Sequence, residues 1–409
     1  MAVRSLPKAV AGVVPAKKAS ALAQTRALIH KAFPKDESFV EIDEDSIKES
    51  RAHLPTGSIV MDYLIGGRIN RFGVRPCPGL PRKCIINLYG QESSGKTTFA
   101  LTAAAMTCAG GGSVGYIDWE NSIDVSYSKA LGVPLDNPDL FALYQPESLE
   151  KGISILWTMA KAGVDLIVID SVGAGVPQST LGQTVVEKGE MGRIGTNAAQ
   201  WSKLLPELKN IINQTGSCVI GISQLRKKIG GMTGFGGEDT HAQGGEAWKF
   251  YSEVRMGLKK IHTEKGKDYN SLTHKVEDAT VGQTVKCRID KCKVSASQGR
   301  TADFYIRFGD GIDDMRSIIE IAAAHGVIKK VSSWFSFERP DGTIIKKAGL
   351  EAFKAAVKET DGVWDELYTA AIKVMSEKPG SFVEVIEQED DFSDLNEIMF
   401  EPKPVVEEE

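Results

Sequence analysis

Short apolar runs alternate with amphipathic segments through the middle of this 409-residue chain. Three segments repeat apolar residues at three- to four-residue spacing and predict helices, at 97–108, 149–162 and 198–214. Around them, eight apolar runs predict β-strands, at 84–88, 113–117, 140–143, 165–169, 218–222, 253–260, 283–291 and 302–308. Strands separated by helices favour parallel pairing, so the pattern predicts an α/β fold with a mostly parallel central sheet. The last strands follow one another closely, and we expect an antiparallel extension at one edge.

The ends of the chain have other patterns. Residues 16–33 predict a helix that Pro34 ends, and an acidic linker follows. Beyond residue 311, predicted helices at 315–325 and 348–357 flank a short aromatic segment. Glycine-rich stretches at 182–195 and 227–245 interrupt the core, and loops of this length are usually functional or disordered. The chain therefore divides into a basic N-terminal segment with helix and linker (1–52), a core (53–313), a small C-terminal α/β domain (314–378) and an acidic disordered tail (379–409).

Charge resolved along the chain changes what composition implies. The net charge of −5, taken alone, argues against a nucleic-acid-binding protein. Residues 377–409, however, contain 12 Asp and Glu against 2 Lys, so residues 1–376 carry a net +5. The first 35 residues contain 7 Lys and Arg and no acidic residue. The sequence thus combines a basic body with an acidic tail, and such tails often act as interaction segments.

Several features speak against export and membrane insertion. No apolar run approaches the roughly 18 residues of a membrane span, and the N-terminus has no apolar signal region. The six cysteines form no CxxC pair and suit a reducing compartment. A basic start without acidic residues also fits an organelle transit segment, but it runs directly into the predicted helix. We expect a cytoplasmic protein that does not contact a membrane.

A complete GxxxxGK[ST] motif lies between a predicted strand and a predicted helix, which is the context that a phosphate-binding loop requires. Its residues are Gly90, Gln91, Glu92, Ser93, Ser94, Gly95, Lys96 and Thr97. The glycines let the loop curl so that backbone N–H groups and the helix N-terminus face phosphate oxygens. We expect Lys96 to neutralise the β- and γ-phosphates of ATP and Thr97 to bind Mg²⁺. A chance glycine-rich turn is the alternative.

Three further strands end in polar side chains. Asp170 follows the run LIVI, and beside a phosphate loop such a carboxylate approaches Mg²⁺, usually through water. Glu120 follows another strand and could act as a general base on the attacking water. Gln224 ends a third strand and could bind the γ-phosphate through its amide. On its own, an Asp at the position of Asp170 is more often a helix cap or turn residue. Glu120 fits a solvated loop glutamate equally well, and Gln224 fits a structural cap equally well.

These segments, in this order, resemble the RecA family of bacterial and phage homologous-recombination proteins over about residues 16–376. The matching segments are LPTGS (54–58), GQESSGKTT (90–98), YIDWENSIDVSY (116–127), DSVGAGVP (170–177), GEMG (189–192), QLRKKIG (224–230), GGEAWKFYSEVR (244–255), DKCKVSA (290–296) and GDGI (309–312). The resemblance implies a RecA-type P-loop NTPase core with an N-terminal helix and a small C-terminal domain. It also implies a helical filament on single-stranded DNA, with ATP held between subunits.

The resemblance further implies roles for residues around ATP. It makes Glu120 the catalytic glutamate and Asp124 and Tyr127 adenine contacts, and it extends the phosphate loop to Thr98. Lys291 and Lys293 would reach the neighbouring subunit's nucleotide, and Phe308 would cover the neighbour's adenine from the same side. The alternative for the two lysines is a solvated strand edge. The N-terminal helix would pack on a neighbouring subunit, and docking on its own core is the alternative.

DNA contacts follow from the same resemblance. Residues 189–192 mark the first DNA-binding loop, and the second loop lies between Gln224 and Gly245. We expect phosphate contacts from Arg226 and Lys228, insertion of Ile194 and Ile229 between bases, and close backbone approach at Gly244 and Gly245. Lys259, Lys260 and Arg288 resemble the site for an incoming duplex. Inward packing of the isoleucines and a chance exposed strand face are the alternatives.

The function expected from these features is an ATP-dependent recombinase. It would polymerise on single-stranded DNA, pair it with a homologous duplex and exchange strands, with DNA-stimulated ATP hydrolysis that uses Mg²⁺. A ring-forming, helicase-like motor and a DNA-binding protein that uses ATP only as a clamp are the alternatives. The sequence does not indicate which mediator or loader proteins act with it.

Overall fold

The computed structural model describes residues 24–25, 28–29, 31–32, 48–70, 72–181, 190–227, 240–242, 245–270 and 274–377. The chain divides into two compact units, Met1–Ile47 and Lys48–Glu409. In the first unit, all the described residues between 24 and 32 are helical, within the helix predicted at 16–33. The predicted acidic tail, 379–409, lies outside the described residues.

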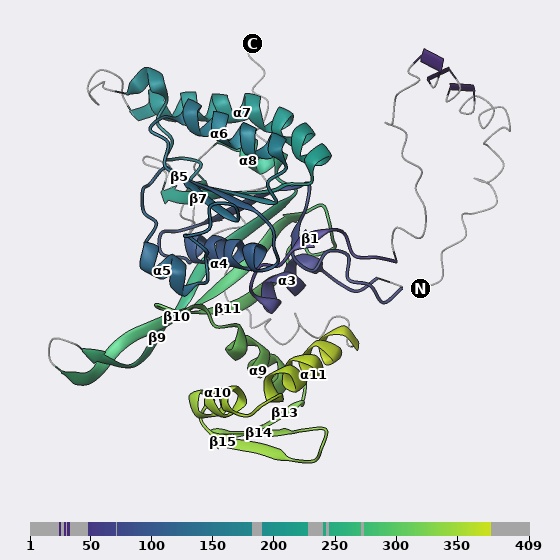
Figure 1. Cartoon of the computed structure of the whole chain (residues 1–409), viewed down its shortest axis with the longest axis vertical. Helices are drawn as coiled ribbons and strands as arrows, with labels where there is room; N and C mark the ends of the chain where they lie inside the picture. Colours follow the sequence, from purple (N-terminus) through teal and green to yellow (C-terminus); the bar gives the residue numbers. More distant parts are fainter. Residues whose placement is uncertain are drawn as a thin grey trace, which may run out of the picture. The chain divides into compact units, whose positions relative to one another are not determined.

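A ten-stranded sheet runs through the second unit in the order β12-β11-β10-β9-β3-β7-β6-β4-β5, with β8 paired to β7 (Figure 1). Its strands are β3 (Ile85–Gly90), β4 (Val114–Asp118), β5 (Phe141–Tyr144), β6 (Leu166–Asp170), β7 (Cys218–Lys227), β8 (Thr240–Ala242), β9 (Val254–Asn270), β10 (Lys275–Cys292), β11 (Thr301–Arg307) and β12 (Gly311–Ile312). Pairing is parallel from β9 across to β5 and antiparallel from β9 to β12. The predicted mostly parallel sheet with an antiparallel edge is therefore confirmed.

Helices cover both faces of the parallel half. On one face Ile86 packs with Phe99 of α4 (Lys96–Ala109), and α3 (Ile59–Gly66) continues this layer over the antiparallel strands β10 and β11. On the other face Ile85 packs with Leu205, and this layer contains α6 (Leu149–Ala162), α7 (Glu190–Thr215) and α8 (Glu246–Tyr251). Neighbouring residues of one strand thus face opposite cores, which is why these strands read as unbroken apolar runs. The short connections are the pair β1 (His53–Leu54) and β2 (Leu80–Pro81), helix α5 (Val125–Ala130) and a 3-10 turn at Gln178–Thr180.

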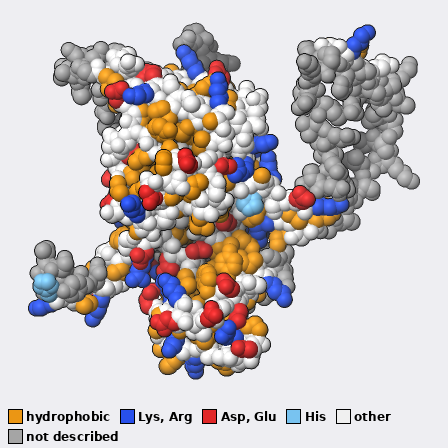
Figure 2. All heavy atoms as spheres, in the orientation of Figure 1, with side chains coloured by type: hydrophobic (Ala, Val, Ile, Leu, Met, Phe, Trp, Pro, Cys, Tyr) orange, Lys and Arg blue, Asp and Glu red, His pale blue; other side chains and the backbone are white. Residues whose placement is uncertain are grey.

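Strands β9 and β10 extend well beyond the sheet as a two-stranded ribbon. They remain paired as far as Asn270 and Lys275, whereas β11 pairs with β10 only between Gly282 and Arg288. The ribbon projects from the body and bears basic and histidine side chains (Figures 1 and 2). The apolar runs predicted only the buried base of this ribbon, because the residues beyond it are mostly polar.

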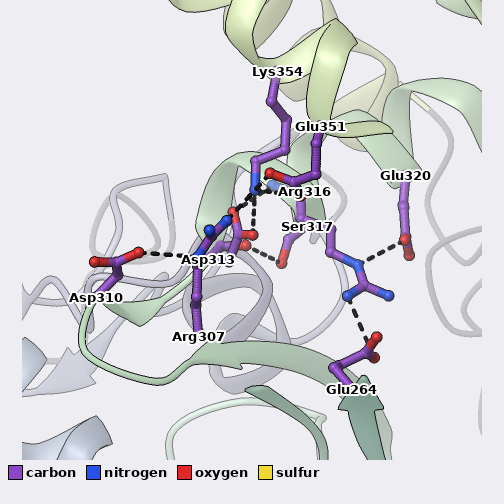
Figure 3. A network of polar contacts seen from close by, with 9 residues as sticks. All are labelled: Glu264, Arg307, Asp310, Asp313, Arg316, Ser317, Glu320, Glu351 and Lys354. Carbon is purple, nitrogen blue, oxygen red and sulfur yellow. Dashed lines mark hydrogen bonds and ion pairs between the residues drawn. The ribbon is translucent and has the colours of Figure 1, made fainter. Parts of the chain in front are cut away.

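The C-terminal segment forms a small subdomain beside the antiparallel half. It contains α9 (Asp314–Ala324), a three-stranded sheet of β13 (Ile328–Val331), β14 (Trp334–Glu338) and β15 (Ile344–Ala348), then α10 (Leu350–Glu359) and α11 (Val363–Glu377). Lys354 of α10 reaches Asp313 across 2.5 Å, and Arg307 at the end of β11 contacts both Asp310 and Glu351 (Figure 3). Lys354 is buried, so this network ties the subdomain to the core.

In the described part of the chain, no helix is long and apolar enough to span a membrane.

Candidate nucleotide-binding site

The carboxyl ends of four parallel strands meet at one edge of the sheet. Gly90, the last residue of β3, pairs with Gln224 of β7, and Asp118 of β4 pairs with Asp170 of β6. This register brings the predicted phosphate loop, metal carboxylate, catalytic glutamate and terminal amide to one place. Ligands bind at this edge in open parallel sheets, at the ends of neighbouring strands.

The phosphate loop is shaped by its glycines and closed by Lys96. Gly95 has a left-handed backbone, with φ of 87°, and it immediately precedes α4. A Cβ at Gly90 would collide with the carbonyl of Leu258 and lie too close to the Ser94 hydroxyl. The Lys96 ammonium donates to the carbonyls of Gly90 at 3.1 Å and Gln91 at 2.6 Å, and burial lowers its pKa. The lysine therefore lies across the mouth of the loop, where the oxygens of a bound phosphate would replace these carbonyls as its hydrogen-bond acceptors.

Thr97 and Asp170 form an oxygen pair suited to Mg²⁺. The Thr97 hydroxyl donates to Asp170 Oδ2 at 2.8 Å, and the phenol of Tyr116 donates to the same oxygen at 2.9 Å. Asp170 is 4% exposed, and burial raises its pKa to about 6. Among the described residues, no group of three or more His, Cys, Asp and Glu side chains could hold a metal. A hydroxyl, a carboxylate and substrate phosphates are the ligands that Mg²⁺ commonly takes in such sites, so the residues fit this ion.

Glu120 is joined to Gln224 and to the strand that carries Asp170. The Gln224 amide donates to Glu120 Oε1 at 3.0 Å, and the Ser171 hydroxyl donates to the same oxygen at 2.5 Å. The loop itself is built by Asp118, which is fully buried and accepts hydrogen bonds from the backbone N–H groups of Glu120 and Ser122. The predicted base and the predicted γ-phosphate sensor are thus directly connected.

The predicted adenine contacts lie beside the phosphate loop. The Thr98 hydroxyl is 3.0 Å from the phenol of Tyr127, and Asp124 caps α5 by accepting from the Tyr127 backbone at 2.9 Å. Phe308 is 50% exposed directly after β11. Its predicted role needs a second subunit and stays a prediction.

Lys291 lies in an unexpected place. Its ammonium donates to the carbonyls of Lys249 at 3.0 Å and Phe250 at 2.8 Å, near the C-terminus of α8, and burial lowers its pKa. Lys293 is exposed. Within one subunit, therefore, Lys291 caps the helix that follows the second glycine-rich stretch, and only Lys293 extends into solvent.

The predicted duplex group separates between the two faces of the sheet. Lys286 on β10 pairs with Lys259 on β9, and Arg288 pairs with Gly257, so Lys259, Lys286 and Arg288 share one face. Lys260 pairs with Val285 and belongs to the opposite face. Arg288 also forms an ion pair with Asp290 at 3.2 Å. Lys286 itself is buried and lies opposite Asp303 of β11, so it is not part of an exposed basic surface.

The remaining predicted DNA contacts are only partly described. The predicted first DNA-binding loop, 189–192, is helical from Glu190, because α7 begins there. Ile194 lies in α7 and Arg226 in β7, but their side chains are outside the described residues. Lys228, Ile229 and Gly244 also lie outside them. Gly245 directly precedes α8 with φ of 84°, and a Cβ there would press on Ala198 of α7.

Comparison with known proteins places the chain in a family. Residues 20–313 match the family model described as the RecA N-terminal domain. The chain belongs to the RecA family. A protein named RecA from Chlorobaculum tepidum is 37% identical over 336 residues, which cover 81% of this chain and 86% of that protein. Another from Borrelia hermsii is 35% identical over 370 residues, covering 89% and 94%. A third from Chloroherpeton thalassium is 36% identical over 318 residues, covering 76% and 78%. The predicted family and core fold are thereby confirmed.

Proposed function

We propose that this RecA-family protein is an ATP-dependent recombinase that polymerises on single-stranded DNA and pairs it with a homologous duplex. The observation that carries the proposal is the convergence of Lys96, Thr97, Asp170, Glu120 and Gln224 at one sheet edge, on and beside β7, the strand that enters the second glycine-rich stretch. A nucleotide site and a DNA-binding segment would then share β7. We also propose that the protein acts in the cytoplasm.

In this proposal the phosphate loop binds ATP, and Lys96 leaves its two carbonyl partners to donate to the β- and γ-phosphates. Mg²⁺ would be held by the Thr97 hydroxyl and, through water, by Asp170, and it would stabilise charge on the phosphate oxygens. Glu120 accepts the proton of the attacking water as general base. Asp118 keeps the Glu120 backbone in place through the hydrogen bonds described above.

Gln224 would couple ATP to DNA. Its amide donates to Glu120 in this structure, and a γ-phosphate is a competing acceptor at the same edge. Transfer of the amide from glutamate to phosphate would free the base and pull the end of β7, from which the second glycine-rich stretch continues. Arg226 and Lys228 would then neutralise DNA phosphates, and Ile194 and Ile229 would insert between bases.

A neighbouring subunit would complete the site. Lys293 is available to approach a neighbour's phosphates, whereas Lys291 must first release the α8 carbonyls. Phe308, half exposed at the end of β11, would cover the neighbour's adenine.

Lys259 and Arg288, on one sheet face, would contact the incoming duplex, with Lys260 at the opposite face. The N-terminal helix would pack on the neighbouring core, and the C-terminal domain and acidic tail would regulate access of duplex DNA.

Joint-molecule formation between a circular single strand and a homologous linear duplex tests the proposal. The full chain with ATP and Mg²⁺ should convert both DNAs into slower-migrating joint molecules, and a heterologous duplex should give none. The Lys96→Ala variant should form none with either duplex, because phosphate binding is lost. Absence of joint molecules with the wild-type chain would contradict the proposal. Electron microscopy of the same mixture would separate a filament from a ring-shaped motor.

A further inference from the structure

Three tryptophans from distant parts of the sequence form a continuous chain behind the nucleotide site. Trp119 follows β4, Trp201 lies in α7 and Trp248 lies in α8. The ring centroids of Trp119 and Trp201 are 6.1 Å apart at an interplanar angle of 78°, and those of Trp201 and Trp248 are 5.1 Å apart at 69°. Both contacts are edge-to-face, an arrangement that stabilises aromatic pairs beyond the burial of their area. Trp201 is completely buried and Trp248 is 1% exposed.

The surrounding backbone is shaped around these indoles. A Cβ at Gly152 would collide with the ring of Trp119, and one at Gly175 would lie 3.2 Å from it. A Cβ at Gly221 of β7 would collide with the ring of Trp248. The indole N–H of Trp201 donates to the carbonyl of Val172 at 2.9 Å, and that of Trp119 donates to Ser148 at 3.3 Å. Close packing of this kind has few alternative arrangements, so a shift at one ring must displace the next.

The two ends of the chain reach the catalytic pair. Trp119 directly precedes Glu120, and Trp248 packs on β7 at Gly221, three residues before Gln224. Trp201, between these ends, lies in α7, which begins within the first glycine-bearing stretch, and Trp248 lies in α8, which follows the second. Val172 joins the middle, because it accepts from Trp201 and donates its backbone N–H to Ile222 of β7.

We propose that Trp119, Trp201 and Trp248 act as one positioning unit that couples the Glu120 loop to helices α7 and α8, and so couples ATP turnover to DNA binding. The inference rests on the proposed function, since it assigns the regulation of that same site. When Glu120 and Gln224 separate around a γ-phosphate, the Trp119 ring moves with its neighbour. Trp201 and Trp248 pass this displacement to α7, which begins within the first predicted DNA-binding loop, and to α8, which follows the second. Spatial continuity alone does not establish coupling, so coupling must be measured directly.

The experiment measures the stimulation ratio, which is ATP turnover with saturating single-stranded DNA divided by turnover without DNA. The variants are Trp119→Phe, Trp248→Phe and the double variant. Each single change should lower the ratio by about fivefold, the lower end of typical couplings between sites, and leave ATP affinity without DNA unchanged. The double variant should lose no more than either single variant, because either break interrupts the same chain. The stimulation ratio separates a positioning role from a structural one, since general destabilisation lowers both turnover rates together.

Trp157→Phe is the matched control. This indole lies on α6 with the Lys161 ammonium 5.3 Å from its ring centroid, outside the chain of three, and the change should leave the ratio unaltered. Trp119 is only partly buried, so Trp119→Phe carries the test alone if Trp248→Phe does not fold. A stimulation ratio that stays unchanged in the single variants would overturn the proposal, whether turnover falls equally with and without DNA or does not fall. Losses that multiply in the double variant would also overturn it. A wild-type protein without any DNA stimulation would instead contradict the proposed function.

Discussion

The parallel and antiparallel halves of the large sheet position polar side chains in different ways. In the parallel half, both strand faces are buried under helices, so polar residues are concentrated at the strand ends, where Gln224, Glu120 and Asp170 meet. In the antiparallel half, polar residues alternate along the strands, and Lys259 and Arg288 share one face with Lys286, which is buried and lies opposite Asp303. The ends of neighbouring strands bring a few side chains within hydrogen-bond distance of one another, which suits a reaction at a single bond. The face of a strand presents cationic side chains at every second residue, which suits contact with an extended polyanion such as DNA.

The largest expected effect is at the strand ends. Glu120→Gln keeps the size and hydrogen bonds of the side chain but removes the base. ATP turnover should fall by about 10² to 10⁴, the usual contribution of a positioned base. Nucleotide affinity, measured by equilibrium binding, should be retained. Glu147→Gln is the control, since Glu147 is exposed and forms a surface ion pair with Lys151 at 3.0 Å. Loss of ATP binding together with turnover would show that Glu120 acts structurally.

A smaller effect tests how finely the strand ends are positioned. Tyr116→Phe removes the phenol that donates to Asp170 Oδ2 and leaves the buried ring in place. Groups that orient metal ligands typically contribute about tenfold or more to metal affinity. The Mg²⁺ concentration for half-maximal binding of a fluorescent ATP analogue should therefore rise by about tenfold, and excess Mg²⁺ should restore binding. The Tyr144→Phe control, at an exposed tyrosine of β5, should not shift the midpoint. An unshifted midpoint in Tyr116→Phe would refute this role.

The antiparallel half should respond with smaller, additive changes. Lys259→Ala and Arg288→Ala should each weaken duplex DNA binding and reduce the slope of log affinity against log salt by about 1. Lys260→Ala should have less effect, because register places Lys260 on the other face. Fluorescence anisotropy over a salt series measures both quantities. Equal losses in all three variants would mean that the two faces do not act separately.

The smallest effect on activity is expected at two buried carboxylates that stabilise the fold and bind no ligand. Asp62 accepts the Thr56 backbone N–H at 2.9 Å, and Asp314 accepts that of Ile59 at 2.9 Å. Burial raises the pKa of Asp62 to about 7 and that of Asp314 to about 6. A raised folded-state pKa means that the folded protein binds more protons, so the free energy of unfolding falls as pH rises from about 4 to about 7.

Asp62→Asn should remove the Asp62 part of this dependence. Relative to wild type, the variant should gain about 3 kcal/mol in unfolding free energy between pH 4.5 and 7.5. Urea unfolding at both pH values measures the difference. An identical pH dependence in both proteins would mean that folding does not raise the pKa of Asp62.

The sequence predicted the parallel half closely, and the reason is physical. Strands buried on both faces read as apolar runs, and the loop at Gly90 to Thr97 has a motif whose chemistry fixes its residues. The ribbon beyond Thr263 was missed, because its polar residues carry no burial signal. Tyr116 lies within an apolar run, where a phenol is indistinguishable from core. The cap that Lys291 gives to α8, and the contacts among Trp119, Trp201 and Trp248, join positions far apart in sequence, so only the fold brings them together.

ATP turnover by the full chain, with and without single-stranded DNA, tests the central claim most directly, namely that one sheet joins a nucleotide site to a DNA-binding surface. The account predicts slow turnover alone, marked stimulation by single-stranded DNA, and loss of both in Lys96→Ala. Stimulation should weaken with rising salt, because phosphate contacts release counterions. Turnover that is unaffected by DNA at low salt would contradict the account.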